Sequence, residues 1–124
     1  MKQHSILLVD DDAILVKGMK AILEAAGHKV TGVLNGTKAL EELEAAKFDL
    51  VITDVFFPGK DGIEVILERS KSDSHAHVIA LSGEGKYATD HYLRLVRKLG
   101  ADVILKKPFG AEQLLAAVAS AFPA

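Results

Sequence analysis

The sequence predicts an α/β fold in which five parallel strands form a doubly wound sheet. Short apolar runs alternate with longer stretches whose apolar residues recur at helical spacing. Right-handed crossovers between parallel strands then place helices on both faces of the sheet. Polar residues directly follow several of the apolar runs. Ligand sites of such sheets lie beyond the carboxyl ends of the strands, so these polar residues are the candidates for function.

Each expected element is named by its residues. Strands are predicted near 5–9, 29–34, 49–53, 77–82 and 102–106. Helices are predicted near 12–26, 36–47, 62–71, 86–99 and 110–121. Gly27 and Gly100 stand where helices end in a left-handed residue, and the side chain of Asn35 can cap the second helix.

Length and composition fit one domain, residues 1–124, with no output domain. The hydrophobic share of 49% and the charged share of 26% are typical of a globular domain with a packed core. A net charge of -2 provides no general attraction to nucleic acid or to an anionic membrane. The absence of cysteine excludes disulfides, thiolate metal sites and a cysteine nucleophile. No apolar run is long enough for a membrane span or a signal peptide, so we expect a cytoplasmic protein.

Acidic residues follow two of the expected strands. Asp10, Asp11 and Asp12 come directly after the apolar run 6–9, and Asp54 ends the third apolar run. Because the carboxyl ends of parallel strands meet at one edge, these carboxylates should converge. Mg²⁺ and Mn²⁺ prefer carboxylate oxygens as ligands. We therefore expect a divalent cation at this edge, with Asp12 mainly capping the first helix.

A hydroxyl and an ammonium group are expected at the same edge. The fourth strand ends in Ser82, and the fifth leads into Lys106, Lys107 and Pro108. A carboxylate can act as the nucleophile in phosphoryl transfer, while a metal ion and a lysine neutralise charge on the phosphoryl oxygens. Asp54 is the best-placed nucleophile for such a reaction.

These residues resemble the receiver domains of two-component response regulators, particularly the stand-alone chemotaxis and phosphorelay type. The resemblance spans the whole chain and is carried by six segments, 6–12, 51–54, 58–62, 80–83, 100–102 and 107–109. It implies a flavodoxin-like (βα)5 sheet with strand order 2-1-3-4-5. It also implies a protein that catalyses its own phosphorylation and dephosphorylation without being a conventional enzyme.

The resemblance implies a role for each acidic residue. Asp54 would accept a phosphoryl group from a phosphohistidine of a histidine kinase or a histidine phosphotransfer protein. Asp11 and Asp54 would bind Mg²⁺ or Mn²⁺ together with the backbone carbonyl of Phe56. Asp10 would act mainly through a metal-bound water. The signal would pass to a downstream target protein by protein contacts, with no direct role for nucleic acid and no membrane insertion.

The resemblance also assigns the hydroxyl and the ammonium. Ser82 would hydrogen-bond the phosphoryl group. Lys107, directly before Pro108, matches the lysine of the family's site better than Lys106 does. Adjacent side chains of a strand point to opposite faces, which separates the two lysines. The family further implies a cis bond before Pro108.

The chain departs from the family pattern at two positions. Ile104 stands where many receivers have an aromatic residue that turns inward on phosphorylation, so coupling to Ser82 is expected through backbone movement at Gly83 and Glu84. Phe56, two residues after Asp54, should flank the approach of hydrolytic water together with Glu84. We therefore expect the aspartyl phosphate to be lost more slowly than with a small residue at position 56.

The first helix presents a candidate partner surface. Helical spacing predicts a core stripe of Leu15, Met19, Ile22, Leu23 and Ala26. A second, small apolar flank lies beside the acidic site. Since this helix docks a histidine-bearing helical bundle in the family, Ile14, Leu15 and Gly18 are the candidates for partner contact. The alternative is that they pack at the periphery of the core.

Two other functions compete with the phosphoacceptor. One is an interaction scaffold that keeps the receiver fold and works without phosphorylation. The other is a phosphatase of the haloacid-dehalogenase type, because Asp10 and Asp12 provide its spaced aspartate pair. That family requires threonine or valine where Ile14 stands, and it usually carries a cap domain for which this chain has no room.

The histidines suggest no second metal site. His75 and His77 can share one face of a strand, but no third ligand accompanies them. His4, His28 and His91 are expected to be ordinary surface or edge residues.

Overall fold

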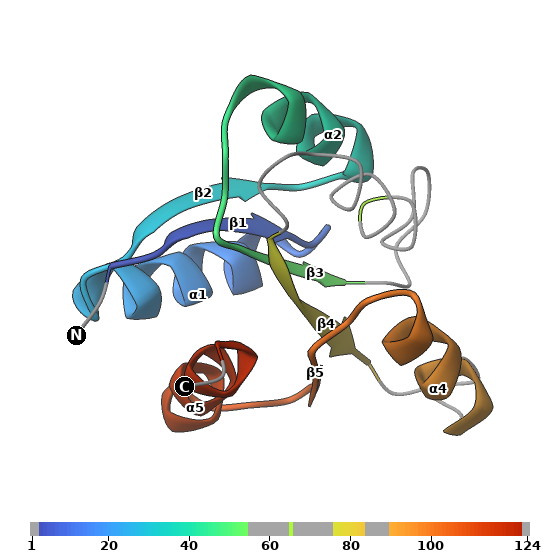
Figure 1. Cartoon of the computed structure of the whole chain (residues 1–124). Coiled ribbons are helices and arrows are strands. Elements are labelled where there is room, and N and C mark those ends of the chain that lie inside the picture. The colour runs from blue at the N-terminus through green and yellow to red at the C-terminus, as the bar shows by residue number, and fades with distance from the viewer. Residues whose placement is uncertain (1–2, 55–64, 66–75, 84–89, 123–124) are drawn as a thin grey trace.

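Five parallel strands form one sheet in the order β2-β1-β3-β4-β5 in the computed structural model, which confirms the predicted fold class (Figure 1). The structure describes residues 3–54, 65, 76–83 and 90–122. The elements are β1 (Ser5–Val9), α1 (Ala13–Ala25), β2 (Lys29–Val33), α2 (Gly36–Ala45), β3 (Leu50–Asp54), β4 (His77–Ser82), α4 (Asp90–Lys98), β5 (Val103–Lys106) and α5 (Ala111–Ala121). Of the helix expected over 62–71 only Val65, which is helical and buried, is described, and the start of the helix expected over 86–99 lies outside the described residues.

The central strands are buried on both faces of the sheet. All five residues of β3 and the last four of β1 are buried. A parallel sheet covered by helices on both sides needs continuous apolar strands rather than alternating ones, which explains these apolar runs. The covered sheet thus leaves only the ends of its strands for polar chemistry.

Two helices cover each face of the sheet among the described elements. Ile6 and Leu8 of β1 pack in a cluster with residues of α1 and α5. Leu7 and Val9 point the other way and pack with Ala39 of α2. Residues of β4 on that second face pack against α4, and Figure 1 shows α1 and α5 together on one side of the sheet.

The predicted core stripe of α1 was incomplete. Val16, which was not in the stripe, is buried with Met19 and Leu23, whereas Leu15 and Ile22 are only partly buried. Val16 is buried because α1 lies so close to β2 that the Val16 side chain packs directly against Gly32 of the strand. His28 was expected to be an ordinary surface or edge residue, and it does precede the edge strand β2, but it is buried, with an exposed fraction of 6%.

The expected helix ends are present. Asp12 Oδ1 accepts hydrogen bonds from the amides of Ile14 (3.0 Å) and Leu15 (3.2 Å), so it caps α1. Asn35 caps α2 by accepting from the Lys38 amide at 2.8 Å. These side chains satisfy amides that the first turn of a helix leaves without partners. Among the helices of the described ranges, none combines the length and the apolarity that crossing a membrane requires.

Gly27 and Gly100 also confirm the predicted helix ends. Both adopt positive φ, 97° at Gly27 and 126° at Gly100. A side chain is strained in this region, which favours glycine two residues after the end of α1 and of α4.

Substituting two glycines should change stability in opposite directions. A Cβ at Gly32 would lie 2.7 Å from Cγ1 of Val16, whereas a Cβ at Gly18 would meet nothing within 4 Å. Valine is branched at Cβ and stiff, so it cannot turn away easily. We expect Gly32→Ala to lower the free energy of unfolding by about 1–3 kcal/mol. Gly18→Ala should raise it by about 0.5–1 kcal/mol, because glycine weakens a helix interior. Urea unfolding measures both, and a Gly32→Ala variant as stable as the wild type would contradict the close packing of α1 on β2.

Candidate functional site

Four strand ends deliver the candidate residues to one edge of the sheet. Asp10 follows β1, Asp54 ends β3, Ser82 ends β4 and Lys107 follows β5. The register pairs Val9 with Thr53, Asp54 with Leu81 and Ser82 with Lys106. The strands therefore end at nearly the same level, and their polar residues lie together beyond the carboxyl ends.

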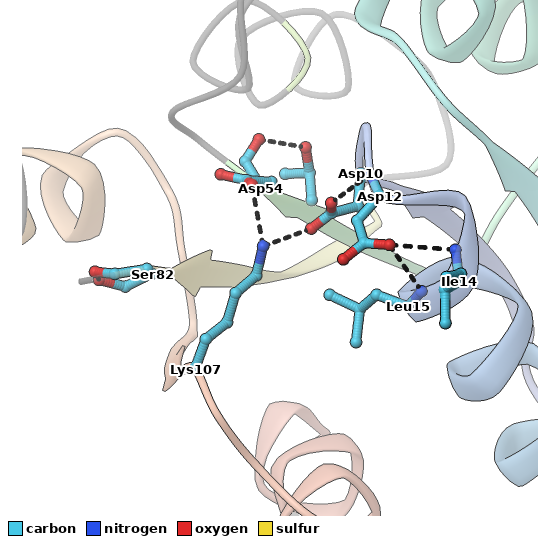
Figure 2. A network of polar contacts seen from close by, with 9 residues as sticks. Asp10, Asp12, Ile14, Leu15, Asp54, Ser82 and Lys107 are labelled. Carbon is cyan, nitrogen blue, oxygen red and sulfur yellow. Dashed lines mark hydrogen bonds and ion pairs between the residues drawn. The ribbon is translucent and has the colours of Figure 1, made fainter. Parts of the chain in front are cut away.

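Lys107 connects the two buried carboxylates. Its Nζ donates to Asp10 Oδ2 at 2.7 Å and to Asp54 Oδ2 at 3.0 Å (Figure 2). Asp10 has an exposed fraction of 0% and Asp54 one of 8%. The backbone amide of Lys107 donates to the carbonyl of Ser82 at 2.8 Å, which fixes the segment that carries the ammonium. The peptide bond between Lys107 and Pro108 is cis, as the resemblance implied.

The neighbouring lysine has a different environment. Lys106 is exposed, whereas Lys107 is half-buried and forms both ion pairs. The alternation of side chains along a strand separates them, as expected. The structure thus brings Lys107 to the two carboxylates of this edge.

Burial makes the charge of Asp10 costly. Burial raises the pKa of Asp10, and hydrogen bonds from Lys107 and from the amide of Asp12, together with the attraction of Lys107, offset this only in part. The folded protein therefore binds a proton more tightly than the unfolded chain does. The stability that the protonated form provides is lost as pH rises through the ordinary pKa and up to the raised pKa. Near neutral pH, the ionised Asp10 carboxylate lowers stability and favours a cation beside it.

The pKa of Lys107 is raised as well, but in an amine a raised pKa favours the charged form. Burial alone would lower the pKa of Lys107, but its hydrogen bonds to Asp10 and Asp54 and the attraction of both carboxylates raise it above the ordinary value. The stability that Lys107 contributes is complete below the ordinary pKa and is lost only as pH rises through the raised value. The ammonium is therefore charged throughout the neutral range.

The carboxylates fit a hard divalent cation. Asp10, Asp11 and Asp54 each offer one ligand oxygen, and these oxygens lie within 4.8 Å of one another. Asp11 is exposed, so the cluster has one side open to solvent. Mg²⁺ takes one or two carboxylates and keeps several waters, which this half-open donor set allows. The third expected protein ligand, Phe56, lies outside the described residues.

Ser82 stands apart from the ion-paired cluster in Figure 2. Its side chain is buried, and its hydroxyl donates to the carbonyl of Gly83 at 3.4 Å. Ser82 lies at the end of β4, as expected, and its hydrogen bond to a phosphoryl group stays a prediction. Ile104 is partly buried and packs in the cluster of Val78, Ala80, Val96 and Ala101. Glu84 lies outside the described residues.

Sequence reasoning missed Thr53. Its side chain is buried, and its hydroxyl donates to the backbone carbonyl of Asp54 at 3.0 Å. This bond holds the backbone at the point where β3 presents its terminal carboxylate. A polar residue inside an otherwise apolar strand was the signal that could have identified it.

The candidate partner residues of α1 differ in exposure. Ile14 has an exposed fraction of 85%, Gly18 is exposed, and Leu15 is partly buried against the core. Ile14 lies in the first turn of α1, two residues after the cap Asp12 and close to the carboxylates (Figure 2). Peripheral core packing is thus wrong for Ile14 and correct for Leu15.

Comparison with known proteins agrees with this geometry. The family described as response regulator receiver domain matches residues 6–119. This chain belongs to that family. The receiver domain is 33% identical over 114 residues to chemotaxis protein CheY of Thermotoga maritima, which covers 91% of this chain and 92% of that protein. Its fold matches the structure of chemotaxis protein CheY4 of Vibrio cholerae with a TM-score of 0.88 and 27% identity, covering 98% and 100% of the two chains.

Other relatives of the receiver domain are longer. It is 37% identical over 115 residues to transcriptional regulatory protein CpxR of Escherichia coli K12, covering 93% of this chain and 47% of that protein. The chain likewise spans 52% of the uncharacterized transcriptional regulatory protein YkoG of Bacillus subtilis. The expectation that residues 1–124 act without an output domain stays a prediction.

Proposed function

We propose that this receiver domain is a phosphoacceptor, which takes a phosphoryl group onto Asp54 from a phosphohistidine of a histidine kinase or histidine phosphotransfer protein. The observation that carries the proposal is the position of Lys107 Nζ, 3.0 Å from Asp54 Oδ2 and 2.7 Å from Asp10 Oδ2. An ammonium fixed beside a carboxylate at the end of a buried strand is suited to phosphoryl transfer.

Each residue has a defined part in the proposed reaction. A carboxylate oxygen of Asp54 attacks the phosphorus atom, the bond from phosphorus to the donor imidazole breaks, and an acyl phosphate forms. Lys107 stabilises the negative charge of the phosphoryl oxygens, and Ser82 donates a hydrogen bond to one of them. Hydrolysis of the acyl phosphate by water returns Asp54 to its carboxylate form.

A divalent cation completes the proposed site. Asp11 and Asp54 would bind Mg²⁺ or Mn²⁺ with the carbonyl of Phe56, and Asp10 would reach the ion through a water. The ion would neutralise charge that the transferred group brings into the acidic cluster. The three carboxylates support this assignment because their ligand oxygens lie within 4.8 Å of one another.

We infer that both the input and the output of the switch are protein contacts. The exposed Ile14, with Leu15 and Gly18, offers an apolar flank beside the acidic edge that suits a helical phosphodonor. Ile104 of β5 packs against Val96 of α4, so a change at Ser82 would reach α4 through the backbone at Gly83 rather than through an aromatic ring. A downstream target protein, in the cytoplasm, would read that change.

Intact mass after incubation with acetyl phosphate tests the proposal. The wild type should gain one phosphoryl group in Mg²⁺ and none in excess EDTA. Asp54→Asn should gain none, whereas Asp49→Asn, a change of an exposed carboxylate before β3, should be labelled like the wild type. Absence of labelling in the wild type would overturn the proposal and favour a phosphorylation-independent scaffold. Labelling that survives in Asp54→Asn but is lost in Asp10→Asn would instead move the acceptor to Asp10, as in a haloacid-dehalogenase-type phosphatase.

A further inference from the structure

An aromatic cluster lies at the edge of the sheet opposite the acidic site. It comprises His4 before β1, His28 before β2, His77 at the start of β4, and Phe122 after α5. The rings of His4 and Phe122 stack with centroids 3.8 Å apart and planes 3° apart. His4 also stacks on His28 at 5.4 Å, and His77 meets Phe122 edge-on at 4.9 Å. The cluster joins segments from the start, the middle and the end of the chain.

His28 is the buried member of this cluster. Its exposed fraction is 6%, and its Nδ1 accepts a hydrogen bond from the backbone amide of His4 at 3.1 Å. An accepting Nδ1 carries no proton, so the ring is neutral in this arrangement. The amide of His28 donates to the carbonyl of Leu23 at 3.1 Å, and the amide of Lys29 donates to the carbonyl of His4 at 3.0 Å. The ring is therefore held by one hydrogen bond from the His4 amide, and the other two bonds fix the backbone on either side of His28.

We propose that His28 is a proton-sensitive latch, whose neutral ring holds the start of β1 and the end of α5 on this edge of the sheet. Protonation of Nδ1 removes the lone pair that accepts from the His4 amide. The bond breaks, and the new N–H is left facing another N–H. Because the His4 ring rests on Phe122, displacement of His4 also releases the residue that follows α5. The acidic site at the other edge keeps its own contacts.

The surroundings of His28 favour the neutral ring. Burial lowers the pKa of His28, and the neighbouring imidazole of His4 lowers it further. The acidic groups of this edge contact the other histidines: Asp49 Oδ2 lies 4.0 Å from His4 Nδ1, and Asp102 Oδ2 lies 3.4 Å from His77 Nδ1.

The remaining elements bring no anion to His28 among the contacts of the described residues. From α1, the backbone carbonyl of Leu23 contacts the His28 amide. From the end of α5, the neutral ring of Phe122 stacks on His4. Lys29 is a cation, and it is exposed. A base whose pKa is lower in the folded state stabilises the fold above its ordinary pKa. That stability is lost as pH falls from the ordinary value toward the lowered one. Mild acidification should therefore open the latch.

A pH titration of the wild type by NMR tests this proposal directly, between pH 8 and 5. The His28 ring should titrate below the ordinary value of about 6.5, and the amide signal of His4 and the ring signals of Phe122 should move with the same midpoint. Hydrogen-exchange protection at the His4 amide should fall by about tenfold per pH unit between the ordinary and lowered pKa values, because opening takes up one proton. A His28 titration that leaves the His4 amide and Phe122 unchanged would overturn the proposal.

Two variants complete the test. His28→Asn can place its Oδ1 near the position of Nδ1, which keeps an acceptor that does not titrate. In this variant the hydrogen-exchange protection of the His4 amide should be independent of pH over this range. His91→Asn changes an exposed histidine of α4 and should keep the wild-type pH dependence. The pH dependence of protection at the His4 amide would belong to another group if it disappeared in His91→Asn. The same would follow if it persisted in a folded His28→Asn. If His28→Asn does not fold, the midpoints measured on the wild type still decide.

Discussion

Lys107→Met should lower the free energy of unfolding by about 3–5 kcal/mol at neutral pH without divalent metal, because removing one partner of a buried ion pair leaves uncompensated charge. Lys107 Nζ lies 2.7 Å from Asp10 Oδ2 and 3.0 Å from Asp54 Oδ2, so two carboxylates lose their counter-charge together. Methionine nearly preserves the length and the apolar stem of lysine, so the loss reports the charge. Urea unfolding of the two proteins in EDTA measures it.

The adjacent lysine provides the matched control. Lys106 is exposed, so Lys106→Met should change stability by less than about 0.5 kcal/mol. Lowering the pH should narrow the difference between Lys107→Met and the wild type, since a protonated Asp10 needs no cation. An equal loss in the two variants, or none in Lys107→Met, would show that the two ion pairs do not stabilise the fold.

The same substitution should impair phosphoryl transfer. An ammonium aimed at the phosphoryl oxygens is worth about a hundredfold or more in rate, by analogy with the loss of one oxyanion donor. Labelling by acetyl phosphate in saturating Mg²⁺ should therefore slow by about that factor in Lys107→Met and remain near the wild-type rate in Lys106→Met. If Lys107→Met were labelled at the wild-type rate, Lys107 would contribute to stability but not to phosphoryl transfer.

The sequence predicted the acidic edge because local signals agree there. Each strand is a continuous apolar run, and a charged or hydroxyl residue marks its end, so Asp10, Asp54 and Ser82 could be placed without coordinates. The choice of Lys107 over Lys106 came from the resemblance to the family, whose site lysine directly precedes a proline, and side-chain alternation only indicated that the two lysines face different sides. In these places local chemistry and tertiary position coincide.

Other features depend on how close two elements approach one another. Val16 is buried because Gly32 lets α1 lie against β2, and the spacing of apolar residues in α1 does not encode that distance. His28 is buried because His4 and Phe122, which are far apart in the sequence, meet at the same edge. The burial of a single histidine cannot be read from its neighbours in the chain, since it depends on contacts of long sequence separation.

Mg²⁺ should stabilise the wild type by about 2.7 kcal/mol when its concentration is about a hundred times the dissociation constant, because a ligand that binds only the folded state shifts the equilibrium. Ionised Asp10 lowers stability near neutral pH, as burial raises its pKa, and a cation within reach of the cluster relieves that cost. Thermal unfolding at increasing Mg²⁺ concentration measures the effect. The rise in Tm should disappear when EDTA removes the metal.

Two adjacent aspartates separate metal binding from helix capping. Asp11→Asn should lose most of the response to Mg²⁺, since it replaces a ligand carboxylate with a weaker, neutral donor. Asp12 Oδ1 accepts from the amides of Ile14 and Leu15, and asparagine caps a helix about as well as aspartate does. Asp12→Asn should therefore keep both its stability and its response to Mg²⁺. An equal loss in the two variants would mean that the ion responds to the general negative charge of 10–12, and an unchanged response in Asp11→Asn would remove that residue from the proposed ligand set.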